Sequence, residues 1–283
     1  PLEGSGVSLT GRLATAPVGI DIDTYAFTVD TDLANHLIDI RLIWQGGATR
    51  QLCLVDASGA DLRCATGETG HAFNQLALPE GDYLLRVSGP VDAANTYMIR
   101  IDIGGEAVDD FEVEPNDDSA HASTVMPDGD SFRSAGRMFE QDIDYFRISI
   151  GGDPQLWLIE VTGDAVEQVQ LVDVNGRQLA QVTPTDGVAS LYDAYLLQGD
   201  TILSVAGSDG DYTVTATPLG PPEPLFELEP NDGVDRSQPI TLGERRTGRI
   251  VTTSDVDTYR FSLQNDTFLS VGLDVAAGAT NTL

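Results

Sequence analysis

The sequence predicts an all-β protein of tandem antiparallel β-sandwiches, two of them complete and a third represented by its first half. Three observations lead to this fold class. The 283-residue chain consists of short segments in which apolar and polar residues alternate, separated by turns rich in Gly, Asp and Asn. No stretch keeps the apolar period of about 3.6 residues that an amphipathic helix needs. The same segments return in the same order at domain spacing, which indicates an internal repeat.

Each unit contains Gly-Arg and an apolar residue, followed by a polar loop and an Asp-x-Asp pair that leads into an alternating strand. The copies are GRLATAPVGIDIDTYAFTVD from Gly11, GRMFEQDIDYFRISI from Gly136 and GRIVTTSDVDTYRFSL from Gly248. Successive side chains of a strand point to opposite faces, so the second Asp shares the core-facing side with every second residue after it. These faces hold Asp23, Tyr25, Phe27 and Val29; Asp144, Phe146, Ile148 and Ile150; and Asp257, Tyr259, Phe261 and Leu263.

The later segments of the first two units also match. LCLVDASGADL parallels VQLVDVNGRQL, each with a turn at Ser-Gly or Asn-Gly between two strands. LPEGDYLLRVSG parallels LLQGDTILSVAG, and NTYMIRI parallels GDYTVTAT. Each full unit thus has about seven or eight strands, as an antiparallel sandwich requires. We expect sandwiches at 1–104 and 105–218, a proline-rich linker at 219–225 and half a sandwich at 226–283.

The charge of the chain excludes some classes of partner. It carries 45 Asp and Glu against 15 basic residues, all of them Arg, for a net charge of −30. Such a field repels nucleic acid and anionic membrane surfaces, so we expect neither as a partner. No apolar run approaches the roughly 18 residues that span a bilayer, and no membrane insertion is expected. The chain begins at Pro1 without a Met, and we interpret it as a fragment or a processed form.

The two cysteines lie on the two arms of one predicted hairpin. A turn centred on Ser58-Gly59 places Cys53 opposite Cys64. A cross-strand disulfide between them indicates an oxidising compartment. Two reduced, half-buried thiols are the alternative.

An acidic motif occurs twice, as FEVEPNDDSA at 111–120 and FELEPNDGVD at 226–235. Alternation in an extended segment puts Glu112, Glu114 and Asn116 on one side, and Pro115 keeps Glu114 out of a helix. Carboxylate and amide oxygens are the hard ligands of which Ca²⁺ takes six to eight. If the segment folds against the strand after each Asp-x-Asp pair, five or six ligands converge. A solvated acidic linker with an Asx-turn at Asn-Asp is the alternative.

Glu-Pro-Asn-Asp, then Gly-Arg, then Asp-x-Asp with alternating aromatics, then a terminal Gly-Asp-Tyr strand, resembles the bacterial pre-peptidase C-terminal domain. It is also similar to the collagen-binding domains of secreted clostridial collagenases. The resemblance covers two units and the first half of a third, and implies a secreted, jelly-roll-like sandwich, often repeated and often attached to extracellular enzymes. Its calcium-binding members imply ligand roles for Glu112, Glu114, Asn116, Asp117, Asp142 and Asp144, and for Glu227, Glu229, Asn231, Asp232, Asp255 and Asp257.

The first unit departs from this pattern. It keeps Asp21 and Asp23 as candidate ligands but has no Glu-Pro-Asn-Asp segment, and Glu3 is the acidic residue left to contribute. A calcium site is therefore less completely specified there than in the other two units.

No catalytic arrangement is present in the sequence, so we expect no enzyme. His36, His71 and His121 are scattered, with neither a His-Glu-x-x-His nor a Gly-x-Ser-x-Gly motif. Trp44 and Trp157 are interpreted as core residues rather than sugar-stacking platforms.

Three functions fit. The first is a secreted or bacterial cell-surface, calcium-stabilised spacer, targeting or adhesion segment of a larger protein, with an extracellular protein or polysaccharide as partner. The second is a structural subunit of a surface layer, filament or appendage, with copies of itself as partners. The third is a processed remnant of a secreted peptidase whose catalytic domain lies outside this chain.

Overall fold

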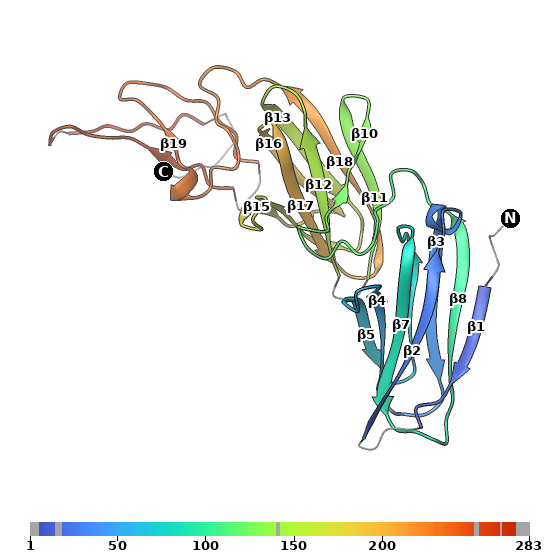
Figure 1. Ribbon diagram of the computed structural model, residues 1–283. Coiled ribbons are helices and arrows are strands. Elements are labelled where there is room, and N and C mark those ends of the chain that lie inside the picture. The colour runs from blue at the N-terminus through green and yellow to red at the C-terminus, as the bar shows by residue number, and fades with distance from the viewer. Residues whose placement is uncertain (1–5, 15–18, 140–141, 252–254, 267, 276–283) are drawn as a thin grey trace. The chain divides into compact units, whose positions relative to one another are not determined.

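The computed structural model describes residues 6–14, 19–139, 142–251, 255–266 and 268–275. The chain forms two compact units, Pro1–Pro221 and Pro222–Leu283. The first unit contains two β-sandwiches, and in each of them two layers of strands face one another (Figure 1). The predicted all-β class is confirmed: apart from two 3₁₀ turns, the regular elements of the described residues are strands.

The first sandwich consists of two four-stranded sheets. One has the order β1-β8-β3-β6 and the other β2-β7-β4-β5, and every pairing is antiparallel. This order is that of a jelly roll, in which eight strands form two Greek keys. The strands are β1 (Gly6–Gly11), β2 (Ile20–Val29), β3 (His36–Trp44), β4 (Arg50–Asp56), β5 (Asp61–Gly67), β6 (Gly70–Leu76), β7 (Gly81–Pro90) and β8 (Tyr97–Glu106), with a 3₁₀ turn η1 at Leu33–Asn35.

The second sandwich repeats this order and adds one short strand to each sheet. Its sheets run β10-β11-β18-β13-β16 and β15-β14-β17-β12-β9. The added strand β9 pairs in parallel with β12, next to the acidic segment. The strands are β9 (Ser123–Thr124), β10 (Met126–Asp128), β11 (Ser131–Met138), β12 (Ile143–Ile150), β13 (Gln155–Thr162), β14 (Val166–Val172), β15 (Gln178–Val182), β16 (Val188–Leu196), β17 (Gly199–Gly207) and β18 (Gly210–Gly220).

Each sandwich buries its own core between its two sheets. In β12, Asp144, Phe146, Ile148 and Ile150 are buried while the alternate residues are more exposed, which confirms the predicted parity. Alternation holds in β2 as well. The two tryptophans are 5% and 3% exposed and belong to the two cores, as expected.

The unit Pro222–Leu283 has little regular structure in its described part. It contains β19 (Gln238–Pro239), β20 (Tyr259–Arg260) and a 3₁₀ turn η2 at Val234–Arg236. The expectation that Phe261 and Leu263 face a core is wrong here, because they are 45% and 43% exposed. The two paired strands of the described segment form no second layer that would cover them.

The predicted disulfide is present. Cys53 on β4 faces Cys64 on β5, and their sulfur atoms are bonded at 2.00 Å. The facing pair at the same place in the second sandwich is Gln170 and Gln181, which share a 3.3 Å side-chain hydrogen bond. A polar contact thus holds this position of the hairpin in one sandwich, and a covalent bond holds it in the other.

Candidate metal centre

Three buried carboxylates meet at one end of the second sandwich. Glu112, Glu114 and Asp144 each place an oxygen within 4.8 Å of the others, and their exposed fractions are 2%, 4% and 0%. We call these residues the inner group. Asp144 lies at the start of β12, whereas the two glutamates come from the extended segment that precedes β9. The sequence prediction that this segment folds against the Asp-x-Asp strand is therefore correct.

Backbone contacts hold the acidic segment in place. The amide of Glu112 donates to the carbonyl of Ala135 at 2.8 Å, and the carbonyl of Asn116 accepts from the amide of Tyr145 at 2.9 Å. The peptide bond between Glu114 and Pro115 is cis. Glu112, Glu114 and Asn116 all face inward. The alternation predicted for this segment is thus present.

Tyr212 on β18 contacts two residues of the inner group through its hydroxyl. Its hydroxyl lies 2.7 Å from Oε2 of Glu112 and 2.5 Å from Oδ2 of Asp144. The amide of Arg137 donates to Oε1 of Glu112 at 2.6 Å. Sequence reasoning did not include Tyr212 in the site, although the repeated Gly-Asp-Tyr strand was a visible signal.

The repeated glycine of each Gly-Arg pair has a steric explanation. A β-carbon on Gly136 would lie 2.8 Å from Oε2 of Glu112 and 2.5 Å from the Tyr212 hydroxyl. Real β-carbons essentially never approach other atoms below 3.0 Å. Glycine is therefore required so that the carboxylate and the phenol can lie against the strand.

Two buried oxygens of this centre have no hydrogen-bond partner. They are Oδ1 of Asn116 and Oδ1 of Asp144, and both residues are 0% exposed. Buried polar atoms are nearly always paired, and an exception indicates a missing water or ion. Two oxygens bound to one hard cation at about 2.4 Å are at most about 4.8 Å apart. The donor set and the spacing of the inner group therefore fit a metal ion.

The raised pKa values of the inner group also favour a bound cation. Burial raises the pKa of Glu112 to about 7. Burial, with the charge of Glu112, raises the pKa of Glu114 to about 8 and that of Asp144 well above its ordinary value. Carboxylates this close and this dry cannot all ionise without a compensating cation. The centre carries excess negative charge that a proton or a metal ion must neutralise.

Asp142 and Asp117 lie outside the inner group. Asp142 is buried, and its Oδ2 is 2.5 Å from Nη2 of Arg63. Asp117 is more exposed, and burial and its hydrogen bond with Asp142 raise its pKa to about 6. These two expected ligands remain predictions, because the structure pairs Asp142 with a guanidinium instead of placing it among the three inner carboxylates.

Arg63 is the other residue that sequence reasoning missed. It belongs to β5 of the first sandwich, yet Nη1 lies 2.9 Å from Oε1 of Glu114 and Nη2 contacts Asp142. Its guanidinium also stacks 4.3 Å above the ring centre of Phe139. No local motif around Arg63 signals this contact, because it depends on how two sandwiches pack.

The unit Pro222–Leu283 has a second centre of the same design. Glu227, Glu229 and Asp257 place oxygens within 4.8 Å of one another, and the Glu229–Pro230 bond is again cis. Burial raises the pKa of Glu227 to about 7 and that of Glu229 to about 8. The amide of Arg249 donates to Glu227 in the same way as that of Arg137 donates to Glu112.

Some features of the second centre differ in detail. Here a residue of the Asp-x-Asp strand, Tyr259, donates its hydroxyl to Oε2 of Glu227 at 3.1 Å. Oε1 of Glu229 and Oδ1 of Asp257 are buried without a hydrogen-bond partner. The side-chain oxygens of the remaining expected ligands accept hydrogen bonds from backbone amides: Asp232 from Val256, Asp255 from Val251, and Asn231 through Oδ1 from Thr258.

The first sandwich brings no such group together in its described residues. Oδ2 of Asp23 accepts from the Tyr97 hydroxyl at 2.5 Å, and Tyr97 also contacts the Tyr25 hydroxyl at 2.6 Å. Asp21 accepts from the amide of Ala14 at 2.7 Å. Glu3 lies outside the described residues. Asp23 thus contacts one of two hydrogen-bonded phenols, whereas Asp144 lies beside two other carboxylates.

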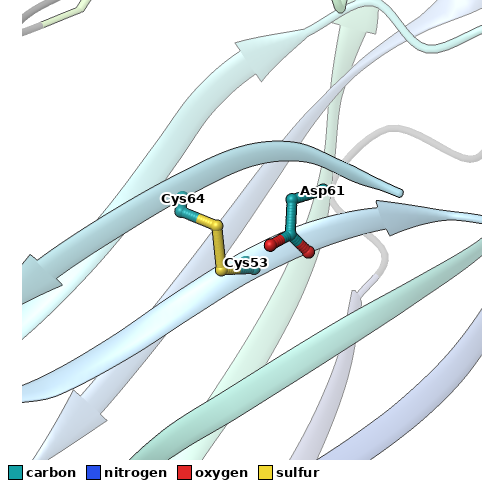
Figure 2. Close-up of side chains that lie close together, drawn as sticks. All are labelled: Cys53, Asp61 and Cys64. Carbon is teal, nitrogen blue, oxygen red and sulfur yellow. A yellow bond between two sulfur atoms is a disulfide. The ribbon is translucent and has the colours of Figure 1, made fainter. Parts of the chain in front are cut away.

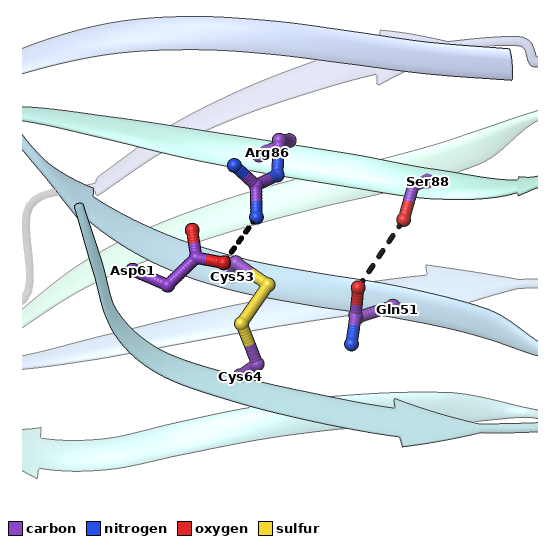
Figure 3. The surroundings of a disulfide bond; sticks show 6 residues. All are labelled: Gln51, Cys53, Asp61, Cys64, Arg86 and Ser88. Carbon is purple, nitrogen blue, oxygen red and sulfur yellow. Dashed lines mark hydrogen bonds and ion pairs between the residues drawn. A yellow bond between two sulfur atoms is a disulfide. The ribbon is translucent and has the colours of Figure 1, made fainter. Parts of the chain in front are cut away.

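A third cluster of potential ligands has a different explanation. Cys53, Asp61 and Cys64 place potential ligand atoms within 4.8 Å of one another. Figure 2 shows the three side chains close together. The two sulfurs are bonded to each other and are not thiolate ligands. Asp61 forms a 2.5 Å ion pair with Arg86 on β7 (Figure 3). This cluster is therefore a disulfide beside an ion pair.

Comparisons with known proteins do not assign a family. No family model matches the chain, and no curated protein matches it. Among solved structures, the PBSX exported protein XepA has a TM-score of 0.28 at 10% identity, over 77% of this chain and 87% of its own. A peptide-N(4)-(N-acetyl-beta-D-glucosaminyl) asparagine amidase reaches 0.30 at 10%, over 78% and 98%. A calcium-binding mutant of a Bacteroides uniformis beta-glucuronidase reaches 0.22 at 14%, over 72% and 22%.

These similarities are too weak to carry an argument about activity. Within the described residues, no helix combines the length and the apolar character needed to cross a membrane.

Proposed function

We propose that this chain is a non-catalytic, secreted or cell-surface array of calcium-stabilised β-sandwiches of the pre-peptidase C-terminal type. It would serve as a spacer, targeting or adhesion segment of a larger extracellular protein. One observation carries the proposal: beside each copy of the acidic motif, three carboxylates come together and buried oxygens are left without a hydrogen-bond partner. A solvated acidic linker would leave these side chains in water instead.

The ligand chemistry favours calcium over other metals. Every candidate ligand in the two centres is an oxygen, whereas zinc prefers nitrogen and sulfur. Magnesium requires near-ideal octahedral geometry and keeps several waters, which suits open sites better than a buried one. Calcium accepts six to eight oxygens in flexible geometry, so it can use both carboxylates and the free amide oxygen of Asn116.

An extracellular location agrees with both the disulfide and the proposed ion. Disulfides persist in oxidising compartments and are rare in the cytosol. Extracellular calcium modules function with dissociation constants of about 10⁻⁴–10⁻³ M, concentrations that cytosol does not reach. A chain with the Cys53–Cys64 bond and two acidic centres suits such a setting.

The burial of the centres supports a structural role rather than catalysis. The three inner carboxylates of the second sandwich are at most 4% exposed, so a substrate cannot reach them. Repetition of the centre in two units also fits scaffolding better than a single active site.

Assembly with other copies is a second candidate. In the unit Pro222–Leu283, Phe261, Val256 and Val271 are 45%, 55% and 60% exposed. Exposed apolar residues at this density mark surfaces that another element covers. Sedimentation velocity across a concentration series separates the two functions, because a monomer at all concentrations contradicts assembly.

Thermal unfolding of the full chain with calcium and with a chelator tests the main proposal. Calcium at about 100 times its dissociation constant adds roughly 2.7 kcal/mol and raises Tm by several degrees. Glu112→Gln together with Glu227→Gln should remove most of this increase. The matched control is Glu160→Gln on β13, a residue that belongs to neither group of carboxylates. An equal Tm with calcium and with chelator would contradict the proposal.

A further inference from the structure

The disulfide-bonded hairpin β4–β5 of the first sandwich carries Arg63, whose side chain contacts the candidate metal centre of the second sandwich. Arg63 is next to Cys64 on β5, and the disulfide to Cys53 ties β5 to β4. The covalent link therefore fixes the backbone from which the guanidinium extends. At the centre, the Arg63 side chain is only 12% exposed.

Arg63 forms two ion pairs between the two sandwiches. Its two terminal nitrogens reach Oε1 of Glu114 at 2.9 Å and Oδ2 of Asp142 at 2.5 Å. The amide of Glu114 also donates to the carbonyl of Ala77 at 3.0 Å. Glu114 therefore contacts the first sandwich through both its carboxylate and its backbone amide.

Glu114 has two functions that oppose each other. It belongs to the inner group that fits a metal ion, and it is also the ion-pair partner of Arg63. A divalent cation and a guanidinium that share one carboxylate repel each other, and burial strengthens this repulsion. Each cation therefore weakens the other's attachment, and linkage makes the two effects equal.

We propose that Arg63 is a built-in competitor of the metal ion at Glu114, so that calcium binding loosens the attachment of the first sandwich to the second. This inference rests on the proposed calcium function and adds a regulatory step to it. A rise in calcium would convert a fixed pair of sandwiches into a more mobile one, and its removal would fix them again.

The second sandwich provides an internal comparison. In its hairpin the residue at the place of Arg63 is Ala180, which pairs with Leu171 as Arg63 pairs with Leu54. The disulfide is replaced there by the pair Gln170 and Gln181. The hairpin of the second sandwich therefore has neither the arginine nor the disulfide. The proposed competition with the metal ion is thus a feature of the contact between the first two sandwiches, not of every repeat.

Calorimetric titration of the full chain with CaCl₂ tests the inference. We expect Arg63→Ala to tighten binding at one of two sites by at least about fivefold, the lower end of usual coupling between sites. The other site, around Glu229, serves as an internal reference. Arg86→Ala is the matched control, because it removes an arginine charge from β7 of the same sheet, where Arg86 pairs with Asp61. Arg63→Lys keeps the charge without the two-pronged contact, and should give an intermediate affinity even if Arg63→Ala folds poorly.

A second readout follows Arg63 itself. Its side-chain Nε–H signal, assigned by its loss in Arg63→Lys, should exchange slowly with solvent in chelator and faster with saturating calcium. Calcium binding by wild type with unchanged or weaker binding by Arg63→Ala overturns the inference while the proposed function stands. Binding by neither protein overturns both. Binding by Arg63→Ala alone supports the inference in its strongest form.

Discussion

Gly136 lies so close to Glu112 that a β-carbon on the glycine would be 2.8 Å from the carboxylate oxygen Oε2. The same relationship recurs in the other acidic centre, where a β-carbon on Gly248 would lie 2.8 Å from Oε1 of Glu227. The glycines of these two Gly-Arg pairs therefore belong to the acidic centres, because they provide the space that the carboxylates occupy.

Replacing Gly136 with alanine should therefore destabilise the second sandwich. The added methyl group would overlap Glu112 and Tyr212, and overpacking of this kind costs about 1–3 kcal/mol. The response of Tm to calcium should shrink as well, because Glu112 is displaced. Gly151→Ala is the control, because its β-carbon would meet nothing within 4 Å. Urea denaturation in chelator measures both variants, and equal losses would contradict the steric explanation.

Tyr212→Phe should destabilise the metal-free protein. The hydroxyl lies within hydrogen-bond distance of both Glu112 and Asp144, so its removal takes one neutral hydrogen-bonding group away from two buried carboxyl groups. Loss of such a buried contact costs about 1–3 kcal/mol. Tyr145→Phe on β12 is the control, since it lies on the opposite face of the strand from Asp144. Chemical denaturation with chelator measures the difference, and a Tyr212 variant as stable as wild type would count against this role.

The alternation of the strands and the position of the acidic segment can be predicted from the sequence, because both depend on local pattern. Alternation fixes which residues of β12 face the core, and the repeat places Glu112 and Glu114 near Asp144. The contact made by Arg63 could not be predicted from the sequence, because it does not depend on local pattern. Its contact with Glu114 joins residues 51 positions apart in different sandwiches, and no period or motif specifies that packing. Tyr212 lies between these cases, because its repeat was visible but its partners were not.

The free energy of unfolding of the metal-free protein should fall as pH rises. Burial raises the folded-state pKa of Glu112 to about 7 and of Glu114 to about 8, above their ordinary 4.5. Below pH 4.5 these groups are protonated in both states, so they cost nothing. Between about pH 4.5 and 8 the unfolded chain ionises first, and folding becomes progressively less favourable. Calcium supplies the missing charge, so its stabilising effect should grow over the same range.

Melting curves at a series of pH values, each with chelator and with calcium, measure this dependence. Carboxyl groups whose pKa is lowered by folding make the protein more stable as pH rises, but only at pH values below their ordinary pKa. They therefore do not offset the loss of stability between about pH 4.5 and 8. They include Asp56, Asp92, Asp118 and Asp173. Stability of the chelated protein that is flat or increasing from pH 5 to 8 would contradict the assignment of the buried carboxylates.

The second sandwich should accept the disulfide that the first one has. Gln170 and Gln181 form the facing pair on β14 and β15 that corresponds to Cys53 and Cys64. The loop between them is as short as the natural one, and closing a loop of this size stabilises a protein by about 2–3 kcal/mol in the chain-entropy model. We expect Gln170→Cys together with Gln181→Cys to oxidise spontaneously and to raise the unfolding midpoint of this sandwich. Mass spectrometry after alkylation detects the bond, and the reduced form of the same variant is the control. Free thiols after air oxidation would show that the two hairpins, despite their common register, differ in side-chain geometry.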